Sequence, residues 1–146
     1  MTIATANTNP ISPARPALSW NTVALLNANI TTDGSGAEGS GAATILTAGV
    51  DGARISRLRV QHRGINVATV MRFFVNNGLD VAVPANNALI AEVTIPALAA
   101  LSQVAANPGV DVTLNIFLKG GFRLRYSIGT AVATGHIVTT PDAGEF

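Results

Sequence analysis

The chain contains no cysteine and few charged residues. Without cysteine it can form neither a disulfide framework nor a thiolate metal site, which fits a protein made and used in a reducing compartment. Only 12% of its 146 residues are Asp, Glu, Lys or Arg, whereas about 25% is typical of soluble domains. So little charge favours burial of part of the surface against a partner or against symmetric copies. The alternative is a plain β-domain whose surface consists of Thr, Asn, Ser and Gly.

The formal net charge is only +1, so the composition does not favour nucleic acid as a partner. The N-terminal sequence lacks the basic start and the long apolar stretch of a signal peptide. The most apolar segment, VTIPALAALSQVAANPGV, is interrupted by two prolines, which is not typical of a membrane span. We therefore expect neither nucleic acid nor a membrane as a partner.

The sequence contains no motif that indicates catalysis. It has no G-x-S-x-G nucleophile motif, and the glycine-rich segment 33–41, DGSGAEGSG, lacks the Lys-Ser/Thr pair of a phosphate-binding loop. Its composition is typical of a flexible loop. His62 and His136 lie far apart in the sequence, and the alternation of His62 with apolar residues predicts a core or edge position for it, with its polar atoms satisfied. Because His, Asp and Glu do not cluster, we predict no enzyme, no catalytic residue, no cofactor and no metal.

Prolines at positions 10, 13 and 16 predict an extended N-terminal arm over residues 1–19, because proline cannot continue a β-ladder. Residues 20–146 are expected to form one domain. Its predicted elements are strands at 21–30, 42–48, 54–64, 65–76, 87–95 and 131–139, a hairpin over 111–129, a short helix over 96–107 and a tail over 141–146. About eight short strands favour a two-sheet β-sandwich, jelly-roll-like in topology, with an immunoglobulin-like sandwich as the alternative.

The strand expected over 65–76 is apolar on both faces. One face contains Val67, Met71, Phe73 and Val75, which we expect to point into the core between the sheets. Arg72 and Phe74 would then lie on the outer face, where a second protein chain could cover them. If the parity is reversed, Phe74 belongs to the core instead.

Arginine accounts for eight of the nine basic residues. Arg57, Arg59 and Arg63 alternate with apolar residues, which predicts a strand with a basic outer face. Arg123 and Arg125 are expected to point outward from the predicted hairpin. Such a face is simply solvated, or it binds an acidic protein, for which arginine is well suited. Nucleic acid is a third alternative, although the aromatic and lysine neighbours typical of such surfaces are missing.

Several turn and packing motifs are spread along the chain. They are N-T-N-P at 7–10, Trp20, D-G-S-G at 33–36, T-A-G-V-D-G-A-R at 47–54, G-I-N-V-A-T-V-M-R-F-F-V-N-N-G at 64–78 and I-G-T-A-V-A at 128–133. Together they resemble a family of small virion structural proteins of tailed bacteriophages. The similarity covers most of the chain and is weakest over 80–115.

The resemblance implies a capsid cement (decoration) protein that is assembled in the host cytoplasm and located on the capsid surface of the virion. The implied partners are the major capsid protein, whose neighbouring subunits it would bridge, and further copies of this chain in a homodimer or trimer. We expect the arm to reach a neighbouring subunit. The expected interface residues are Arg57, Arg59, Arg63, Arg72, Phe74, Arg123 and Arg125. The alternatives are a tail, neck or fibre-associated virion protein and a carbohydrate- or receptor-binding sandwich, although one Trp and one Tyr offer few stacking platforms.

Overall fold

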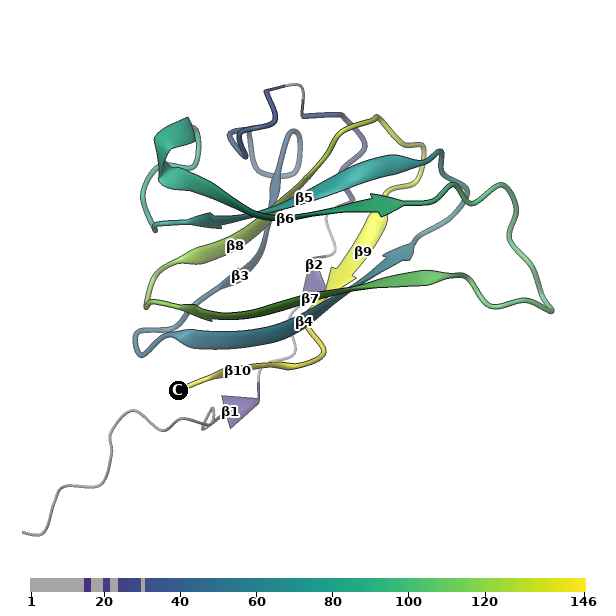
Figure 1. Cartoon of the computed structure of the whole chain (residues 1–146). Coiled ribbons are helices and arrows are strands. Elements are labelled where there is room, and N and C mark those ends of the chain that lie inside the picture. Colours follow the sequence, from purple (N-terminus) through teal and green to yellow (C-terminus); the bar gives the residue numbers. More distant parts are fainter. Residues whose placement is uncertain (1–14, 17–19, 22–23, 30) are drawn as a thin grey trace, which may run out of the picture.

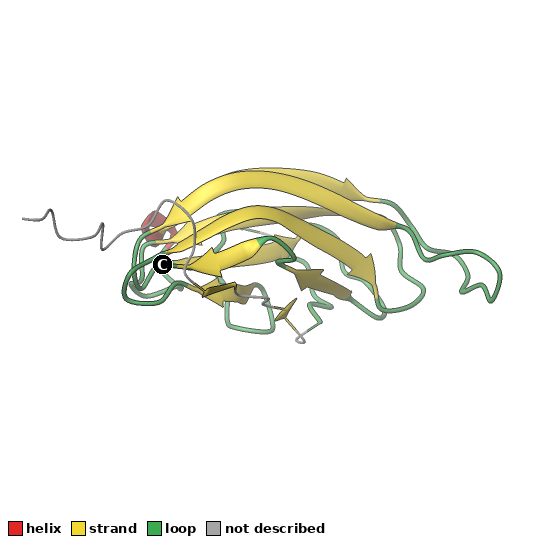
Figure 2. Ribbon diagram, turned by 90° about the horizontal axis from the view of Figure 1, so that it is seen from below, coloured by secondary structure: helices red, strands yellow, loops and turns green. Residues whose placement is uncertain are grey.

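Two antiparallel β-sheets pack face to face in the computed structural model, which describes residues 15–16, 20–21, 24–29 and 31–146 (Figure 1 and Figure 2). The first sheet contains β1 (Arg15–Pro16), β2 (Trp20–Asn21), β4 (Ala53–His62), β7 (Gly109–Leu118), β9 (His136–Thr139) and β10 (Ala143–Glu145). The second sheet contains β3 (Ala43–Thr47), β5 (Thr69–Asn76), β6 (Asn87–Ile95) and β8 (Arg123–Ile128). One short 3-10 turn, η1 (Pro84–Asn86), is the only helical element of the described residues. The predicted all-β sandwich is therefore confirmed.

The six strands of the first sheet fill four positions across it. Along one edge of β4 lies β7, and along the other edge lie β10, opposite Ala53–Ile55, and β9, opposite Arg59–His62. Beyond them, β1 pairs with β10, and β2 pairs with β9. The sheet order is thus β1/β2, β10/β9, β4 and β7, and the second sheet has the order β3, β8, β5 and β6.

The two sheets together have eight strand positions, which we number in chain order. The pairing of these positions is that of one long antiparallel hairpin wrapped into two sheets. The first position (β1 and β2) pairs with the eighth (β10 and β9). The second position (β3) pairs with the seventh (β8). The third (β4) pairs with the sixth (β7), and the fourth (β5) pairs with the fifth (β6). This nested antiparallel order is the jelly roll, and it differs from the strand order of the immunoglobulin sandwich.

Most of the predicted arm, residues 1–14 and 17–19, lies outside the described residues. Within it, Arg15 and Pro16 form β1, which pairs antiparallel with β10 so that Arg15 is opposite Glu145. The chain therefore joins the first sheet before Trp20. The tail predicted over 141–146 is also part of that sheet, because it contains β10.

The prediction of a hairpin over 111–129 is wrong. Its two halves form strands, but β7 pairs with β4 in the first sheet, whereas β8 pairs with β3 and β5 in the second. The turn at 119–122 therefore carries the chain from one sheet to the other. Both strands point alternate apolar side chains toward the same inter-sheet core, and this alternation is the same whether two strands pair or face each other.

The helix predicted over 96–107 is also wrong, because this segment is a loop between β6 and β7. Its side chains are almost all exposed, so the apolar face that stabilises a short helix in a protein finds no core to pack on. Of the strand predicted over 21–30, Asn21 belongs to β2 and residues 24–29 are not in a strand, whereas 22–23 and 30 lie outside the described residues.

The core lies between the inward faces of β4, β5 and β8. Along β4, Ile55, Leu58 and Val60 are buried. Ile55 and Leu58 are three residues apart instead of two, because a β-bulge lies between Ile55 and Arg57. Each such side chain contributes about 1.5–3 kcal/mol on full burial. Tyr126 of β8 is also fully buried, as expected of a core residue, and burial raises its pKa to about 12.

Strand β5 has the predicted inward face. Met71 and Phe73 are fully buried and Val75 is partly buried against them. Val67 is an exception, because it precedes the strand and is 55% exposed. Its predicted core position is wrong, since the strand begins only at Thr69.

The connecting segments collect at two ends of the sandwich. Segments 63–68, 96–108 and 129–135 meet at one end, which we call the groove end. Turns 48–52, 77–86 and 119–122 meet at the other, which we call the turn end. In Figure 1 the loop between β6 and β7 projects to the right at the groove end, and β10 approaches the marked C-terminus at the turn end.

At the turn end, the backbone of Gly52 packs directly against the backbone of Leu118. Its φ is +94°, and a Cβ at this position would lie 2.6 Å from the carbonyl oxygen of Leu118. Gly121 also has a positive φ, of +81°, but a Cβ there would meet no atom within 4 Å. The two glycines thus share the same backbone restriction and differ in the space around them.

We expect Gly52→Ala to destabilise the protein more than Gly121→Ala. Each variant places alanine in left-handed backbone, at a cost of about 1–2 kcal/mol, and only Gly52→Ala also forces the two turns apart. The measurement is the free energy of unfolding in urea. Equal losses in the two variants would show that the turns do not pack as described.

Candidate functional site

The outer face of β4 carries the predicted basic stripe, but its arginines have acidic partners within the chain. Arg59 Nη1 lies 3.1 and 3.0 Å from the two carboxylate oxygens of Asp111 on β7. Arg57 Nε donates to Asp142, at 3.0 Å, in the turn between β9 and β10. Both pairs are about two-fifths exposed or more, so each contributes little to stability. They do, however, neutralise the charge that was expected to attract an acidic protein.

Arg63 is exposed in the segment that follows β4. On the second sheet, Arg72 Nε donates to Glu92 of β6 at 2.6 Å, across the β5–β6 pair. Arg123 is partly exposed, and its Nη1 donates to the carbonyl oxygen of Leu79 at 3.2 Å. Arg57 and Arg59 thus lie on the outer face of one sheet, and Arg72 and Arg123 belong to the other.

Phe74 and Arg125 are buried, which corrects their predicted exposure. They are cross-strand neighbours on the outer face of the second sheet, with exposed fractions of 1% and 0%. The segment 31–42 covers them. Gly34 lies directly over the ring of Phe74, because a Cβ on this glycine would be 2.7 Å from the ring carbons.

Arg125 fastens this covering segment to the sheet. Its Nη1 donates to the carbonyl oxygen of Gly34 at 2.8 Å, and its Nη2 donates to that of Gly36 at 3.2 Å and to the Glu38 carboxylate at 3.3 Å. Glu38 in turn accepts hydrogen bonds from the backbone and hydroxyl of Thr44 on β3. The planar guanidinium can bind several acceptors at once, as a buried cation requires.

The covering segment is also ordered from within. Asn29 Nδ2 donates to the carbonyl oxygen of Ser35 at 2.6 Å. Asp33 accepts hydrogen bonds from Thr31 Oγ1 and from the backbone and hydroxyl of Ser35. The Ser35 hydroxyl contributes most to holding the pKa of Asp33 below its usual value. The glycine-rich sequence predicted as a flexible loop is therefore a fixed cover for the sheet.

We expect Arg125→Met to destabilise the protein by about 1–3 kcal/mol, because it leaves buried carbonyl groups without a donor. Arg123→Met is the matched control, since this neighbouring arginine is partly exposed, and its effect should stay within about 0.5 kcal/mol. Urea unfolding measures both, and hydrogen exchange of the amides of Ser35 and Ala42 reports release of the cover. Equal effects of the two substitutions would contradict the anchoring role of Arg125.

The predicted interface residues therefore do not converge on one surface. An exposed apolar surface occurs instead at the groove end, which sequence reasoning missed. A groove of about 460 Å³ lies there between segments 63–68, 96–108 and 129–135. It is lined by Ile65, Asn66, Val67, Ala97, Leu98, Ala99, Ala131 and Ala133. Ile65 and Val67 are 51% and 55% exposed. The sequence signal was the apolar segment 96–107, which was assigned to a helix.

Asn66 holds this groove in shape. Although it is buried, its Nδ2 donates to the carbonyl oxygen of Gly135 at 2.7 Å, and its Oδ1 accepts from the backbone and hydroxyl of Thr134. Its backbone exchanges two hydrogen bonds with that of Leu98. One residue thus links all three segments of the groove end, through its side chain to 129–135 and through its backbone to 96–108, so the groove is preformed.

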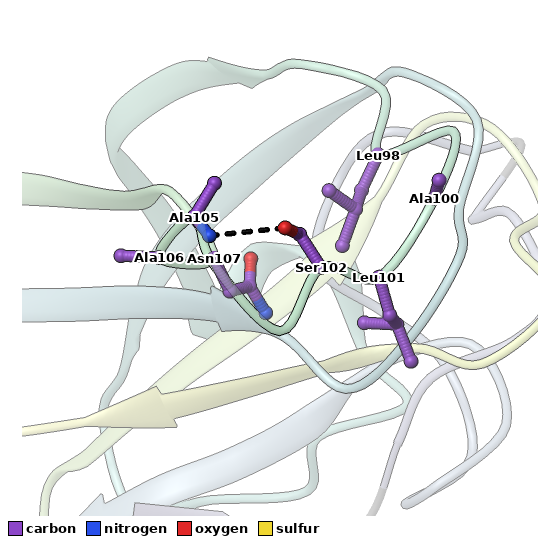
Figure 3. A pocket seen from close by; sticks show the side chains of 7 residues that line it. All are labelled: Leu98, Ala100, Leu101, Ser102, Ala105, Ala106 and Asn107. Carbon is purple, nitrogen blue, oxygen red and sulfur yellow. Dashed lines mark hydrogen bonds between the residues drawn. The ribbon is translucent and has the colours of Figure 1, made fainter.

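The loop between β6 and β7 adds a second hollow beside this groove. Leu98, Leu101, Ser102 and Asn107 line it, together with three alanines, and its volume is about 140 Å³ (Figure 3). Ser102 Oγ accepts a hydrogen bond from the backbone of Ala105 at 3.0 Å, which closes the tip of the loop. Leu101 is 65% exposed and Val104 is 98% exposed, so the loop presents apolar side chains to solvent.

A buried histidine pair lies just inside the groove end. His62 ends β4 and His136 begins β9, and the two are directly opposite in the antiparallel pair. Their exposed fractions are 5% and 1%, and their ring centroids are 4.9 Å apart with an interplanar angle of 48°. His62 was predicted at a core or edge position with its polar atoms satisfied, and the structure places it in the core. The alternation of His136 with Val138 is the sequence signal that predicts a buried position for His136, but it does not predict that His62 lies opposite.

The histidine pair is electrostatically unusual. Among the described residues, none of the four ring nitrogens has a hydrogen-bond partner. Burial lowers the pKa of His136 to about 4, with a smaller contribution from His62, and burial also lowers the pKa of His62. Both rings are therefore neutral at pH 7. A buried polar group without a partner costs about 1–3 kcal/mol, so the pair reduces stability unless something binds to it.

We expect the free energy of unfolding to fall as the pH is lowered from 7 to 5. The unfolded chain binds a proton at His136 near the ordinary pKa of 6.5, whereas the folded protein does so only near 4. The loss over this range is about 2 kcal/mol, and His136→Gln should reduce the slope. Urea unfolding at several pH values tests this, and a wild-type curve that is flat between pH 7 and pH 5 would contradict it.

The described residues contain no group of three or more His, Asp or Glu that could together hold a metal ion. In the same part of the chain, no helix is long and apolar enough to span a membrane. Comparison of the chain with models of protein families, with curated proteins and with solved structures finds no match.

Proposed function

We propose that this chain is a capsid cement (decoration) protein of a tailed bacteriophage. In this role it binds the outside of the capsid shell and bridges neighbouring subunits of the major capsid protein. The observation that carries the proposal is the preformed apolar groove end, where Ile65, Val67, Leu101 and Val104 are exposed. A soluble domain gains nothing from such a surface alone, and apolar patches of this kind are typical of protein–protein contacts.

The charge distribution supports a contact that is mainly apolar. Arg57, Arg59 and Arg72 each pair with a carboxylate of the same chain, and Arg125 is fully buried. These side chains can make few new ion pairs without breaking existing ones. The groove end, in contrast, needs no rearrangement to bind an apolar surface.

Shell stabilisation requires no tight binding by a single copy. Modest contacts are repeated around a symmetric lattice, so the effective concentration of each further contact is high once the first has formed. Homodimers or trimers of the chain would increase this multivalency. The N-terminal arm, predicted over 1–19, would provide a second contact with a neighbouring subunit.

Val104→Asp combined with Val67→Asp should remove most of the protein from the capsid, because both substitutions place charge in the apolar contact. Val50→Asp is the matched control, since Val50 is 91% exposed at the opposite end. Quantitative mass spectrometry of purified virions measures the copies per capsid, after circular dichroism has shown that the variants fold. Unchanged occupancy of the double variant would reject the groove end as the contact.

The same experiment separates heads from tails before analysis. Recovery of the protein with heads agrees with the cement role. Recovery at high copy with tails alone would reject it in favour of the alternative, a tail, neck or fibre-associated virion protein.

A further inference from the structure

The cross-strand histidine pair lies just inside the groove end but is not part of the exposed apolar surface proposed as the capsid contact. His62 and His136 come from strands that are far apart in the sequence, and the return of β9 along β4 places them directly opposite each other. Buried polar atoms without partners are rare in proteins and generally mark a bound water, an ion or a functional role. Four such nitrogens in two adjacent rings therefore point to a ligand that binds imidazole.

We propose that His62 and His136 together bind a divalent transition-metal ion, with Zn²⁺ as the leading candidate. Imidazole nitrogen is a preferred ligand of Zn²⁺, Co²⁺, Ni²⁺ and Cu²⁺. An ion about 2 Å from one nitrogen of each ring lies about 3 Å from each ring centroid, so two rings at a tetrahedral ion have centroids about 5 Å apart. The observed separation is 4.9 Å. The backbone pairing thus holds the ring centroids at a spacing that suits a shared ion.

Asn107 offers an oxygen ligand beside the end of β4. Its Nδ2 donates to the backbone carbonyl oxygen of His62 at 2.8 Å, which fixes the amide beside the end of β4. Its Oδ1 is buried and has no hydrogen-bond partner among the described residues. Water or a small anion would complete the coordination.

The chemistry of the ligands also limits the affinity. Both rings are neutral at pH 7, so the ion displaces no proton from them on binding. However, two neutral ligands do not compensate a buried divalent charge as thiolates or carboxylates do. We therefore expect binding in the micromolar range, weaker than in structural zinc sites, and stabilisation of the groove end when the ion is bound.

The chain is well suited to a direct test, because it contains no cysteine and only these two histidines. The full-length protein is treated with EDTA, dialysed and titrated with Zn²⁺ by isothermal calorimetry. Co²⁺ is then added to the protein, and its visible absorption reports coordination. We expect one site per chain with micromolar Kd and a rise in the thermal unfolding temperature with Zn²⁺. His62→Gln and His136→Gln should each abolish this binding.

Asp33→Asn is the matched control, because it alters a carboxylate in segment 31–42, which covers the second sheet and not the first sheet that contains the pair. This variant should bind Zn²⁺ as the unsubstituted protein does. Nitrogen-15 NMR of the imidazole rings in the unsubstituted protein tests the same site even if the histidine variants fail to fold. Shifts of ring nitrogens in both histidines on addition of Zn²⁺ are expected. The proposal is overturned if neither ring responds at millimolar Zn²⁺, or if only one histidine is required.

Discussion

The interlocked pairing of early with late strands is the constraint on which the other features depend. Because β9 returns along β4, His62 and His136 become neighbours. Because β8 inserts between β3 and β5, Arg125 lies beside Phe74 and beneath the segment that precedes β3. The same arrangement gathers segments 63–68, 96–108 and 129–135 at one end, where they form the groove. A change of strand order would separate each of these groups.

The sequence predicted the faces of strands better than their partners. The alternation in β4 placed Leu58 and Val60 inward and Arg57 and Arg59 outward, because the two-residue period follows from strand geometry alone. The same reasoning failed for the hairpin assigned to 111–129. Apolar alternation shows that a strand faces the core, but it contains no information about which neighbouring strand supplies the hydrogen bonds. Which strands pair with each other is determined by the topology of the whole jelly roll.

The candidate functional residues also show which properties local sequence predicts and which depend on tertiary contacts. Arg125 was correctly placed on an outer face, but its burial depends on segment 31–42, whose Gly, Ser and Asp composition is the same in a loose linker and in a fixed cover. The neutralisation of Arg57 and Arg59 depends on Asp111 and Asp142, which lie on distant parts of the chain. Local pattern therefore identified the chemistry of single side chains, whereas tertiary contacts determined which of them remain available to a partner.

The nested order also determines when the fold can be completed during synthesis. Among the strands that the structure describes, only β5 and β6 are hydrogen-bonded neighbours that follow each other directly in the chain, so this hairpin can form early. In contrast, β1 and β2 must wait for β10 and β9, which the ribosome makes after the other strands of the described sandwich. Until then one edge of β4 has no partner, and the first sheet is open on that side. The outermost layer of the roll is thus the last part of the sandwich to become ordered, although it contains the first of the described strands in chain order.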